Sequence, residues 1–197
     1  GAVRVVVAGS LQARAFRRRL AGAGGALGVR VLTFDGLYAE ILSAGGAAFT
    51  QLSDPVQYRL FAAIAGESKL RHYGKIAGRH GFIQVLRDIV QELKTDLVTP
   101  GALLAGLAAM GNPPRLVEIA RVYAAYQARL QERGWADRAG LGWLAVEALQ
   151  AGQAVSPEQW PLVIFDGFDD FAPMQARLLT WLAPCAGECV VTLTGSE

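Results

Sequence analysis

Apolar residues follow two different spacings along this chain. At the amino end, residues 3–8 (VRVVVA) and 29–33 are short segments rich in β-branched side chains, which predict strands. Residues 11–21 between them have helical spacing, and a strand, a helix and a strand at this distance form a right-handed crossover with parallel strands. A second helix follows, capped by Thr33 or Asp35, with an apolar face of Leu37, Tyr38, Ile41 and Leu42.

The helix expected at residues 11–21 separates apolar from basic positions. Ser10, after the turn at Gly9, is expected to cap this helix. The apolar side is expected to comprise Leu11, Ala15, Phe16 and Leu20, and the opposite side carries Arg14, Arg17, Arg18 and Arg19.

From about residue 52 to residue 150 the spacing is helical and strand signal almost disappears. Helices are predicted from Ser53 or Asp54, over residues 82–93, from Pro100 to Leu107, after Pro114 and from Asp137. The helix after Pro114 has an expected buried stripe of Leu116, Ile119, Ala120, Tyr123 and Leu130, and the helix from Asp137 carries Leu141, Leu144, Ala145 and Leu149. Strand signal returns at residues 162–165 and 189–194.

This order predicts an α/β fold with a parallel sheet of about four strands. The two outer pieces are each too small to bury both faces of a parallel sheet, but together they supply four strands and three helices. We therefore expect residues 1–46 and 157–197 to form one discontinuous α/β core. Residues 47–156 are then an all-helical subdomain inserted into it.

Composition narrows the class of protein. Over 197 residues, 52% are hydrophobic and the net charge is only +2, so a folded core is expected and the total charge does not indicate a nucleic-acid binder. Cys185 and Cys189 are interpreted as reduced thiols, and we expect no membrane span, no secretion leader and a cytoplasmic protein. Because strands stand directly at both ends, the sequence is expected to be a piece of a longer protein.

An acidic cluster follows the strand at residues 162–165. Ligands of open α/β sheets bind at the carboxyl ends of the strands, so Asp166, Gly167, Asp169, Asp170 and Gln175 predict a site descended from a magnesium–nucleotide site. Gly167 stands where nucleotide hydrolases usually have the glutamate that orients water, and no Gly-x-x-x-x-Gly-Lys-Ser/Thr phosphate loop is present. In an alternative interpretation, Asp169 and Asp170 only cap the following helix.

Basic residues form a second local group. Lys69, Arg71, Lys75 and Arg79, with His72, Tyr73 and His80 among them, are suited to a phosphate backbone, with His72 or Tyr73 stacking on a base. The alternative is a solvated loop without a ligand. The two histidines are not expected to bind a metal, because no carboxylate pair accompanies them.

The order of these motifs resembles the first motor domain of UvrD-like superfamily 1 helicases. In particular, it is similar to the inactivated, helicase-like amino-terminal region of the B-subunit family of ATP-dependent helicase/nucleases, which are PD-(D/E)XK nuclease superfamily proteins. The segments that carry the resemblance, over nearly the whole chain, are Val5–Ser10, Val31–Leu37 and Val163–Gln175.

The resemblance implies a role for individual residues. Asp166 matches the metal-associated aspartate, and Asp170 and Gln175 match the helicase motif, whereas Gly167 and Asp169 replace its Glu and Gln. Thr33 and Phe34, and likewise Gly9 and Ser10, match positions that face DNA in active relatives, although Asp35 stands where those relatives often have His. A phosphate-loop strand is expected just before Gly1, and any nuclease domain farther along the full protein.

We thus expect a fragment that does not hydrolyse ATP but binds or guides single-stranded DNA in DNA repair, beside an active helicase/nuclease subunit. No cofactor is expected here, since magnesium and ATP require the upstream phosphate loop. Two alternatives are a protein-interaction module without DNA contact and a working ATPase whose phosphate loop precedes Gly1. The expected DNA-binding residues are Gly9, Ser10, Arg14, Arg18, Thr33, Phe34, Lys69, Arg71, Lys75 and Arg79.

Overall fold

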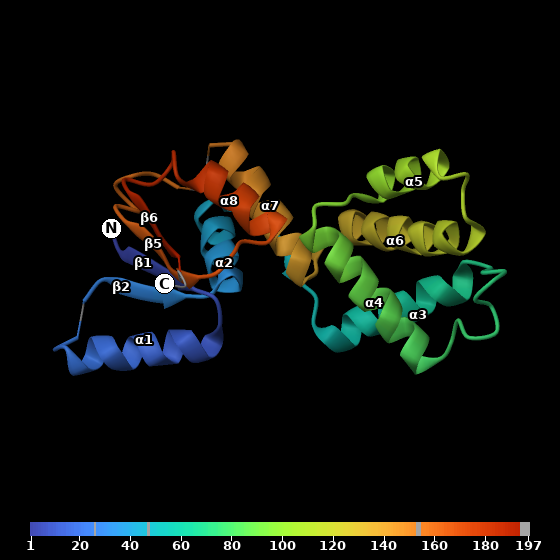
Figure 1. Ribbon diagram of the computed structural model, residues 1–197, viewed down its shortest axis with the longest axis horizontal. Coiled ribbons are helices and arrows are strands. Elements are labelled where there is room, and N and C mark those ends of the chain that lie inside the picture. Colours follow the sequence, from blue (N-terminus) through green and yellow to red (C-terminus); the bar gives the residue numbers. More distant parts are fainter. Residues whose placement is uncertain (26, 47, 153–154, 194–197) are drawn as a thin grey trace. The chain divides into compact units, whose positions relative to one another are not determined.

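A computed structural model describes residues 1–25, 27–46, 48–152 and 155–193 (Figure 1). The chain divides into two compact units. We call the first, Gly1–Ala47 with Leu141–Glu197, the sheet unit, and the second, Ala48–Gly140, the helical unit.

The sheet unit contains a parallel sheet of four strands in the order β2-β1-β5-β6. The prediction of an α/β fold with about four parallel strands is therefore confirmed. β1 is an inner strand that joins β2 to β5, because Val5 pairs with Val31 on one side and with Ile164 on the other. The strands are β1 (Val3–Val7), β2 (Val29–Leu32), β5 (Val163–Phe168) and β6 (Cys189–Leu193).

Helices cover the two faces of this sheet differently. α1 (Ser10–Gly22) packs its Ala13 against Val5, Val7 and Val31 on one face. α2 (Phe34–Ala44) and α8 (Pro173–Leu182) lie on the opposite side of the strands from α1 (Figure 1). β1 connects outward to β2 and β5 connects outward to β6, so right-handed crossovers place their helices on opposite faces. The direction of connection therefore reverses between β1 and β5.

The start and the buried face of α1 differ from the expectation. The helix begins at Ser10, and Gly9, not Ser10, is its N-cap; the Gln12 side-chain oxygen accepts a hydrogen bond from the Gly9 amide at 3.1 Å. Leu11 is 78% exposed and Ala15 is exposed, so they do not belong to the apolar face. The face that meets the sheet is Ala13, Phe16 and Leu20, again at helical spacing but shifted around the axis.

The expected face of α2 is confirmed, since Leu37, Tyr38, Ile41 and Leu42 are all buried. The inserted unit was expected to end at residue 156, but its second boundary with the sheet unit lies between Gly140 and Leu141. The reason is that α7 (Arg138–Gln150) continues across this point into the sheet unit. Its residues from Leu141 onward pack within the sheet unit: a Cβ at Gly142 would lie 2.9 Å from Met174 Cγ and 3.3 Å from Tyr38 Cζ.

The helical unit is built from four helices, with one addition that the sequence did not indicate. β3 (Thr50–Gln51) and β4 (Trp135–Ala136) form a two-residue parallel pair, so the unit is not all-helical. Leu116 was expected in a buried stripe but is 43% exposed, because it lies in the first turn of its helix and the buried residues begin with Glu118. The helices are α3 (Asp54–Glu67), α4 (His80–Thr95), α5 (Pro100–Ala109) and α6 (Pro114–Arg133).

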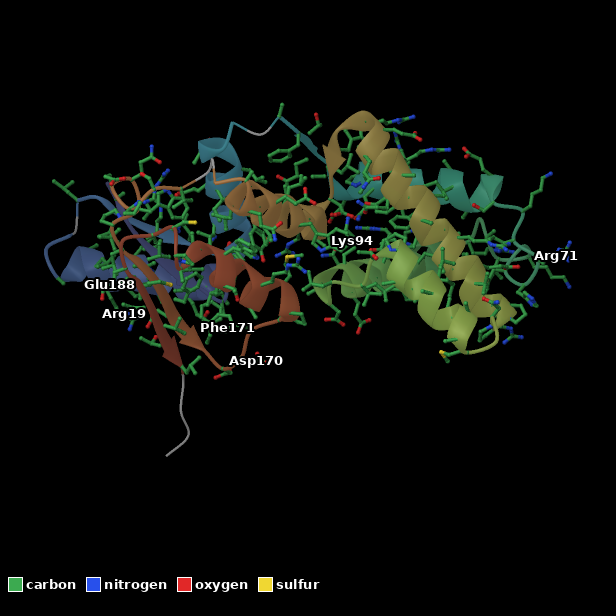
Figure 2. The ribbon with its side chains drawn as sticks, turned by 90° about the horizontal axis from the view of Figure 1, so that it is seen from above. Arg19, Arg71, Lys94, Asp170, Phe171 and Glu188 are labelled. Atoms are coloured by element: carbon green, nitrogen blue, oxygen red, sulfur yellow. The ribbon has the colours of Figure 1, made fainter. Side chains whose placement is uncertain are left out.

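A buried polar network crosses the interior of the helical unit. The Lys94 ammonium, fully buried among the helices (Figure 2), donates to Asp137 Oδ1 at 2.7 Å and to Gln127 at 3.1 Å. The Tyr126 hydroxyl donates to the other Asp137 oxygen at 2.9 Å. Burial lowers the pKa of Lys94, and the Asp137 carboxylate opposes that effect. In the part of the chain that the structure describes, no helix is long and apolar enough to span a bilayer.

The close packing around Gly142 predicts how a substitution there changes stability. A Gly142→Ala substitution places a methyl group inside contact distance of Met174, so we expect it to lower the free energy of unfolding by about 1–3 kcal/mol. Gly36→Ala in α2 is the matched control, because its Cβ would lie 3.4 Å from Leu32 Cδ2, an ordinary contact. Urea denaturation measures both, and equal effects of the two substitutions would contradict the packing argument.

Candidate nucleic-acid interface

The carboxyl edge of the parallel sheet gathers part of the expected sheet-unit site. Val7 pairs with Asp166, so the Gly9–Ser10 turn begins just beyond the level of that carboxylate. Thr33 follows the end of β2 at the same edge. The connections reverse between β1 and β5, which is where open α/β sheets form a ligand crevice. The structure therefore brings Gly9, Ser10 and Asp166 to this point.

A hydroxyl group on β6 orients Asp166. The Thr192 hydroxyl donates to Asp166 Oδ1 at 2.9 Å, and the Thr192 hydroxyl oxygen accepts the Gly167 backbone N–H at 3.1 Å. Thr192 was not singled out from the sequence, because only the parallel pairing of β5 and β6 reveals that it lies beside Asp166.

Gly167 occupies a backbone conformation that L side chains rarely adopt. Its φ is +72°, and the pairing of β5 with β6 shifts register between Phe165 and Phe168. A bulge of this kind uses glycine because a Cβ in the left-handed region is strained. The position expected to have lost a glutamate has thus also departed from regular strand geometry.

Four phenylalanines stabilise the segment around this bulge. Phe34 is only 6% exposed and lies 5.6 Å from Phe165, 5.5 Å from Phe168 and 6.2 Å from Phe171, measured between ring centroids. Phe34 therefore has no open face for a base, and its expected direct contact with DNA does not fit the structure. The sequence signal that we missed is the spacing of Phe165, Phe168 and Phe171 at every third residue.

The remaining acidic-motif residues do not converge on Asp166. Gln175 folds back to its own helix, where its side-chain oxygen accepts the Ala172 N–H at 3.0 Å. Asp169 and Asp170 are exposed, and Ala172 is the N-cap of α8, so neither aspartate caps that helix as the alternative interpretation proposed. Within the described ranges, no group of three His, Cys, Asp or Glu side chains is arranged to hold a metal ion.

The arginines of α1 serve different purposes. Arg14 and Arg18 are exposed and one helical turn apart, which leaves both guanidinium groups accessible. Arg17 instead donates to the Val31 carbonyl oxygen at 2.6 Å. The Arg19 guanidinium lies 5.2 Å from the centre of the Phe16 ring. Of the four, Arg14 and Arg18 are the residues best placed to meet a ligand.

The second basic group forms an exposed loop in the helical unit, and we refer to residues 69–80 as the basic loop. Most of its basic side chains are exposed, and Arg71 projects outward from the helices (Figure 2). Among the described residues, none of its lysines or arginines makes a salt bridge. Tyr73 stacks on Phe82 with ring centroids 5.0 Å apart, which leaves His72 as the better-exposed ring for stacking on a base. Its basic residues are Lys69, Arg71, His72, Lys75, Arg79 and His80.

One carboxylate binds the backbone of the basic loop. Glu118 of α6, 9% exposed, accepts hydrogen bonds from the backbone N–H groups of Arg71, His72 and Tyr73 at 2.7–3.4 Å. Burial raises the pKa of this carboxyl, but the three N–H donors together outweigh burial and lower the pKa below its ordinary value. Sequence reasoning missed Glu118, since it is far from the loop along the chain.

Comparison with known protein families assigns this chain to a family. The AddB N-terminal family matches residues 14–197 of the chain. The chain belongs to the AddB N-terminal family. The matched range contains the basic loop, Glu118 and the Asp166–Gln175 segment of this AddB N-terminal domain, while β1 and the Gly9–Ser10 turn precede it.

Individual relatives agree with this assignment. The B subunit of the ATP-dependent helicase/deoxyribonuclease of Desulforudis audaxviator is 29% identical over 182 residues, which cover 87% of this chain and 15% of that protein. The proteins of the same name from Caldanaerobacter subterraneus and Thermoanaerobacter sp. strain X514 are 26% and 28% identical over 131 residues, or 65% of this chain and 11% of each relative. The chain thus spans only a small part of the length of these relatives.

The conformation of Gly167 in this AddB N-terminal domain gives the second prediction. Gly167→Ala is expected to lower the free energy of unfolding by about 1–2 kcal/mol, because alanine is strained at this φ. Gly167→Asn is the matched control, since asparagine tolerates the left-handed region better. Thermal and urea unfolding should rank stability in the order Gly, Asn, Ala; an alanine variant as stable as the native protein would contradict the assigned backbone.

Proposed function

We propose that this AddB N-terminal domain is a helicase-like module that binds DNA without hydrolysing ATP, within a helicase–nuclease subunit of DNA repair. The observation that carries the proposal is the basic loop, whose four lysines and arginines lack salt bridges within the described residues and have no acidic residue among them. Lysines and arginines without an acidic partner attract phosphates, and the binding of a nucleic acid to them releases its counterions. The printed names of the relatives, which specify a helicase and deoxyribonuclease subunit, support DNA as the ligand.

Single-stranded DNA fits the basic loop best. Single strands are bound by cationic surfaces that track the backbone, aided by exposed rings on which bases stack. His72 supplies such a ring beside Arg71 and Lys75. In the sheet unit, Arg14, Arg18, Thr33 and the Gly9–Ser10 turn form a second surface, but Asp166, Asp169 and Asp170 follow at the same sheet edge and oppose a polyanion. We therefore assign the larger electrostatic contribution to the basic loop.

Loss of hydrolysis is proposed from the acidic motif. The position after Asp166 carries no carboxylate, and its left-handed backbone is unfavourable for restoring one. Descent from a UvrD-like motor domain, with a P-loop NTPase core and an inserted helical subdomain, is proposed on the position of Asp166 near the carboxyl end of β5, where the connections of the parallel sheet reverse. Magnesium and ATP then have no role in this stretch. The partner we propose is an active helicase/nuclease subunit, and the compartment is the cytoplasm, where the free thiols of Cys185 and Cys189 also fit.

A second function, a protein-interaction module, is favoured by α5. This helix, PGALLAGLAA, contains no charged residue, yet most of its residues are at least partly exposed. Met110 at its end is 68% exposed, and the nearby Leu116 is 43% exposed. Exposed apolar surface of this kind marks protein contacts, so a module that docks a partner and does not touch DNA is the alternative that the experiments below distinguish.

Binding to a fluorescent oligo-dT strand tests the DNA proposal. The affinity should fall steeply as salt rises, with a log–log slope of about 0.7 for each phosphate neutralised. Replacing Lys69, Arg71, Lys75 and Arg79 together with alanine should lower that slope by up to about 3. Anisotropy titrations at several salt concentrations measure the slope.

A matched pair of single substitutions controls for loss of charge alone. Arg71→Ala removes a cation without a salt bridge among the described residues, whereas Arg129→Ala removes one that Glu67 already pairs at 2.6 Å. We expect only Arg71→Ala to weaken binding appreciably. Affinity that does not depend on salt, or equal effects of the two variants, would argue against the basic loop as the DNA site. Absence of any binding to the strand would favour the protein-interaction function.

Hydrolysis is tested on the isolated full-length subunit. We expect no ATPase activity attributable to this site, so Asp166→Ala should leave the measured rate unchanged, and Gly167→Glu should not raise it. Robust ATP hydrolysis that disappears in Asp166→Ala would show a working site and reject the proposal. A coupled phosphate-release assay, run with and without oligo-dT, gives the rates.

A further inference from the structure

Three consecutive backbone N–H groups of the basic loop converge on the Glu118 carboxylate. Oε1 accepts from Arg71 N at 2.7 Å and from His72 N at 3.1 Å, and Oε2 accepts from His72 N at 3.1 Å and from Tyr73 N at 3.4 Å. Glu118 lies on α6, most of whose buried apolar residues belong to the core of the helical unit. The carboxylate thus fixes the backbone from which Arg71 and His72 project.

The rest of the loop is constrained on both sides of this contact. Leu70 is buried in the core, and Tyr73 stacks on Phe82 of α4. Gly74 follows closely on Leu70: a Cβ at Gly74 would lie 2.5 Å from the Leu70 carbonyl oxygen. Residues 70–74 therefore have one tightly specified path, while the side chains of Arg71 and His72 stay exposed.

The electrostatic role of Glu118 is unusual for a carboxylate beside so many cations. A negative charge at this place weakens attraction of phosphates. Its oxygens, however, are engaged by backbone N–H groups, and none of the loop's lysines or arginines makes a salt bridge in the part of the chain that the structure describes. The arrangement organises the loop without consuming its cationic side chains.

We propose that Glu118 is a positioning residue for DNA binding: by holding the backbone of residues 71–73, it presents the side chains of the basic loop to successive phosphates of a single strand. The inference rests on the proposed function of the basic loop. It makes a prediction opposite to that of simple charge, because removing this negative charge should weaken the binding of a polyanion.

The experiment compares two substitutions with the same change of charge in the full chain. Glu118→Gln removes the carboxylate that the loop backbone contacts. Glu67→Gln removes a different carboxylate, which lies two residues before the loop. In the described residues, this carboxylate is paired only with the Arg129 side chain. Binding of oligo-dT is measured by anisotropy at several salt concentrations. We expect Glu67→Gln to bind as tightly as the native protein or more tightly, and Glu118→Gln to bind about 3- to 10-fold more weakly with a slope lower by about 0.7 to 1.4.

A merely structural role is separated by the salt slope and by a double-mutant cycle. If Glu118 acts through the loop, then adding Glu118→Gln to an Arg71→Ala, Lys75→Ala background should have little further effect on affinity. General loss of folding would instead lower binding in both backgrounds. Glu118→Asp, which keeps the charge, should recover part of the affinity. Equal or tighter binding by Glu118→Gln, with an unchanged slope, would overturn the proposal.

A second variant keeps the test valid if Glu118→Gln does not fold. Gly74→Ala leaves every charge in place but forces the loop to move away from the Leu70 carbonyl oxygen. We expect the same direction of change, a weaker affinity and a lower salt slope, and native values for both would count against positioning. The proposed function fails separately if the native chain shows no salt-dependent binding or if the four-residue alanine variant binds like the native chain.

Discussion

The pairing of β1 with β5 is the constraint on which the sheet unit depends. These strands come from opposite ends of the chain, and four consecutive residue pairs, from Arg4–Val163 to Val7–Asp166, bring them together. Without this contact, β1–β2 and β5–β6 would each be a two-stranded fragment with an uncovered face. The same pairing also brings the acidic turn beside the Gly9–Ser10 turn. One set of backbone hydrogen bonds therefore determines both the fold and the composition of the sheet edge.

The local pattern of the sequence was sufficient for the main features of this fold. β-branched segments and crossover distances predicted parallel strands, and the face of α2 was predicted residue by residue. The pattern was insufficient where a neighbour decides burial. Leu116 has helical spacing with Tyr123, but spacing does not show how far along a helix its neighbours extend. Phe34 was expected to contact DNA, because the aromatic rings that cover it come from a distant segment and are not visible in the local pattern.

The partners of charged residues were even harder to predict from the sequence than burial. Lys94 continues the buried face of α4 after Leu86 and Val90, so its position was readable as a core site, but its partner Asp137 was not. Likewise the basic loop was visible in the sequence, whereas its support by Glu118 required a contact across 47 residues. Hydrophobic periodicity reports the environment of one element. Pairing of polar groups depends on distances between elements, which periodicity does not contain.

The hydrogen bond from Arg17 to the Val31 carbonyl oxygen has a consequence for self-association. In the described sheet β2 is an edge strand, and Gly28 uses its carbonyl for β1, so by alternation the Val31 carbonyl points to the open side. An unoccupied acceptor there would invite the strand of another molecule. The guanidinium of Arg17 occupies it, and Arg30, paired with Glu40 at 3.1 Å, adds a second long polar side chain to the same strand. Two arginines thereby discourage copies of this domain from joining their sheets edge to edge.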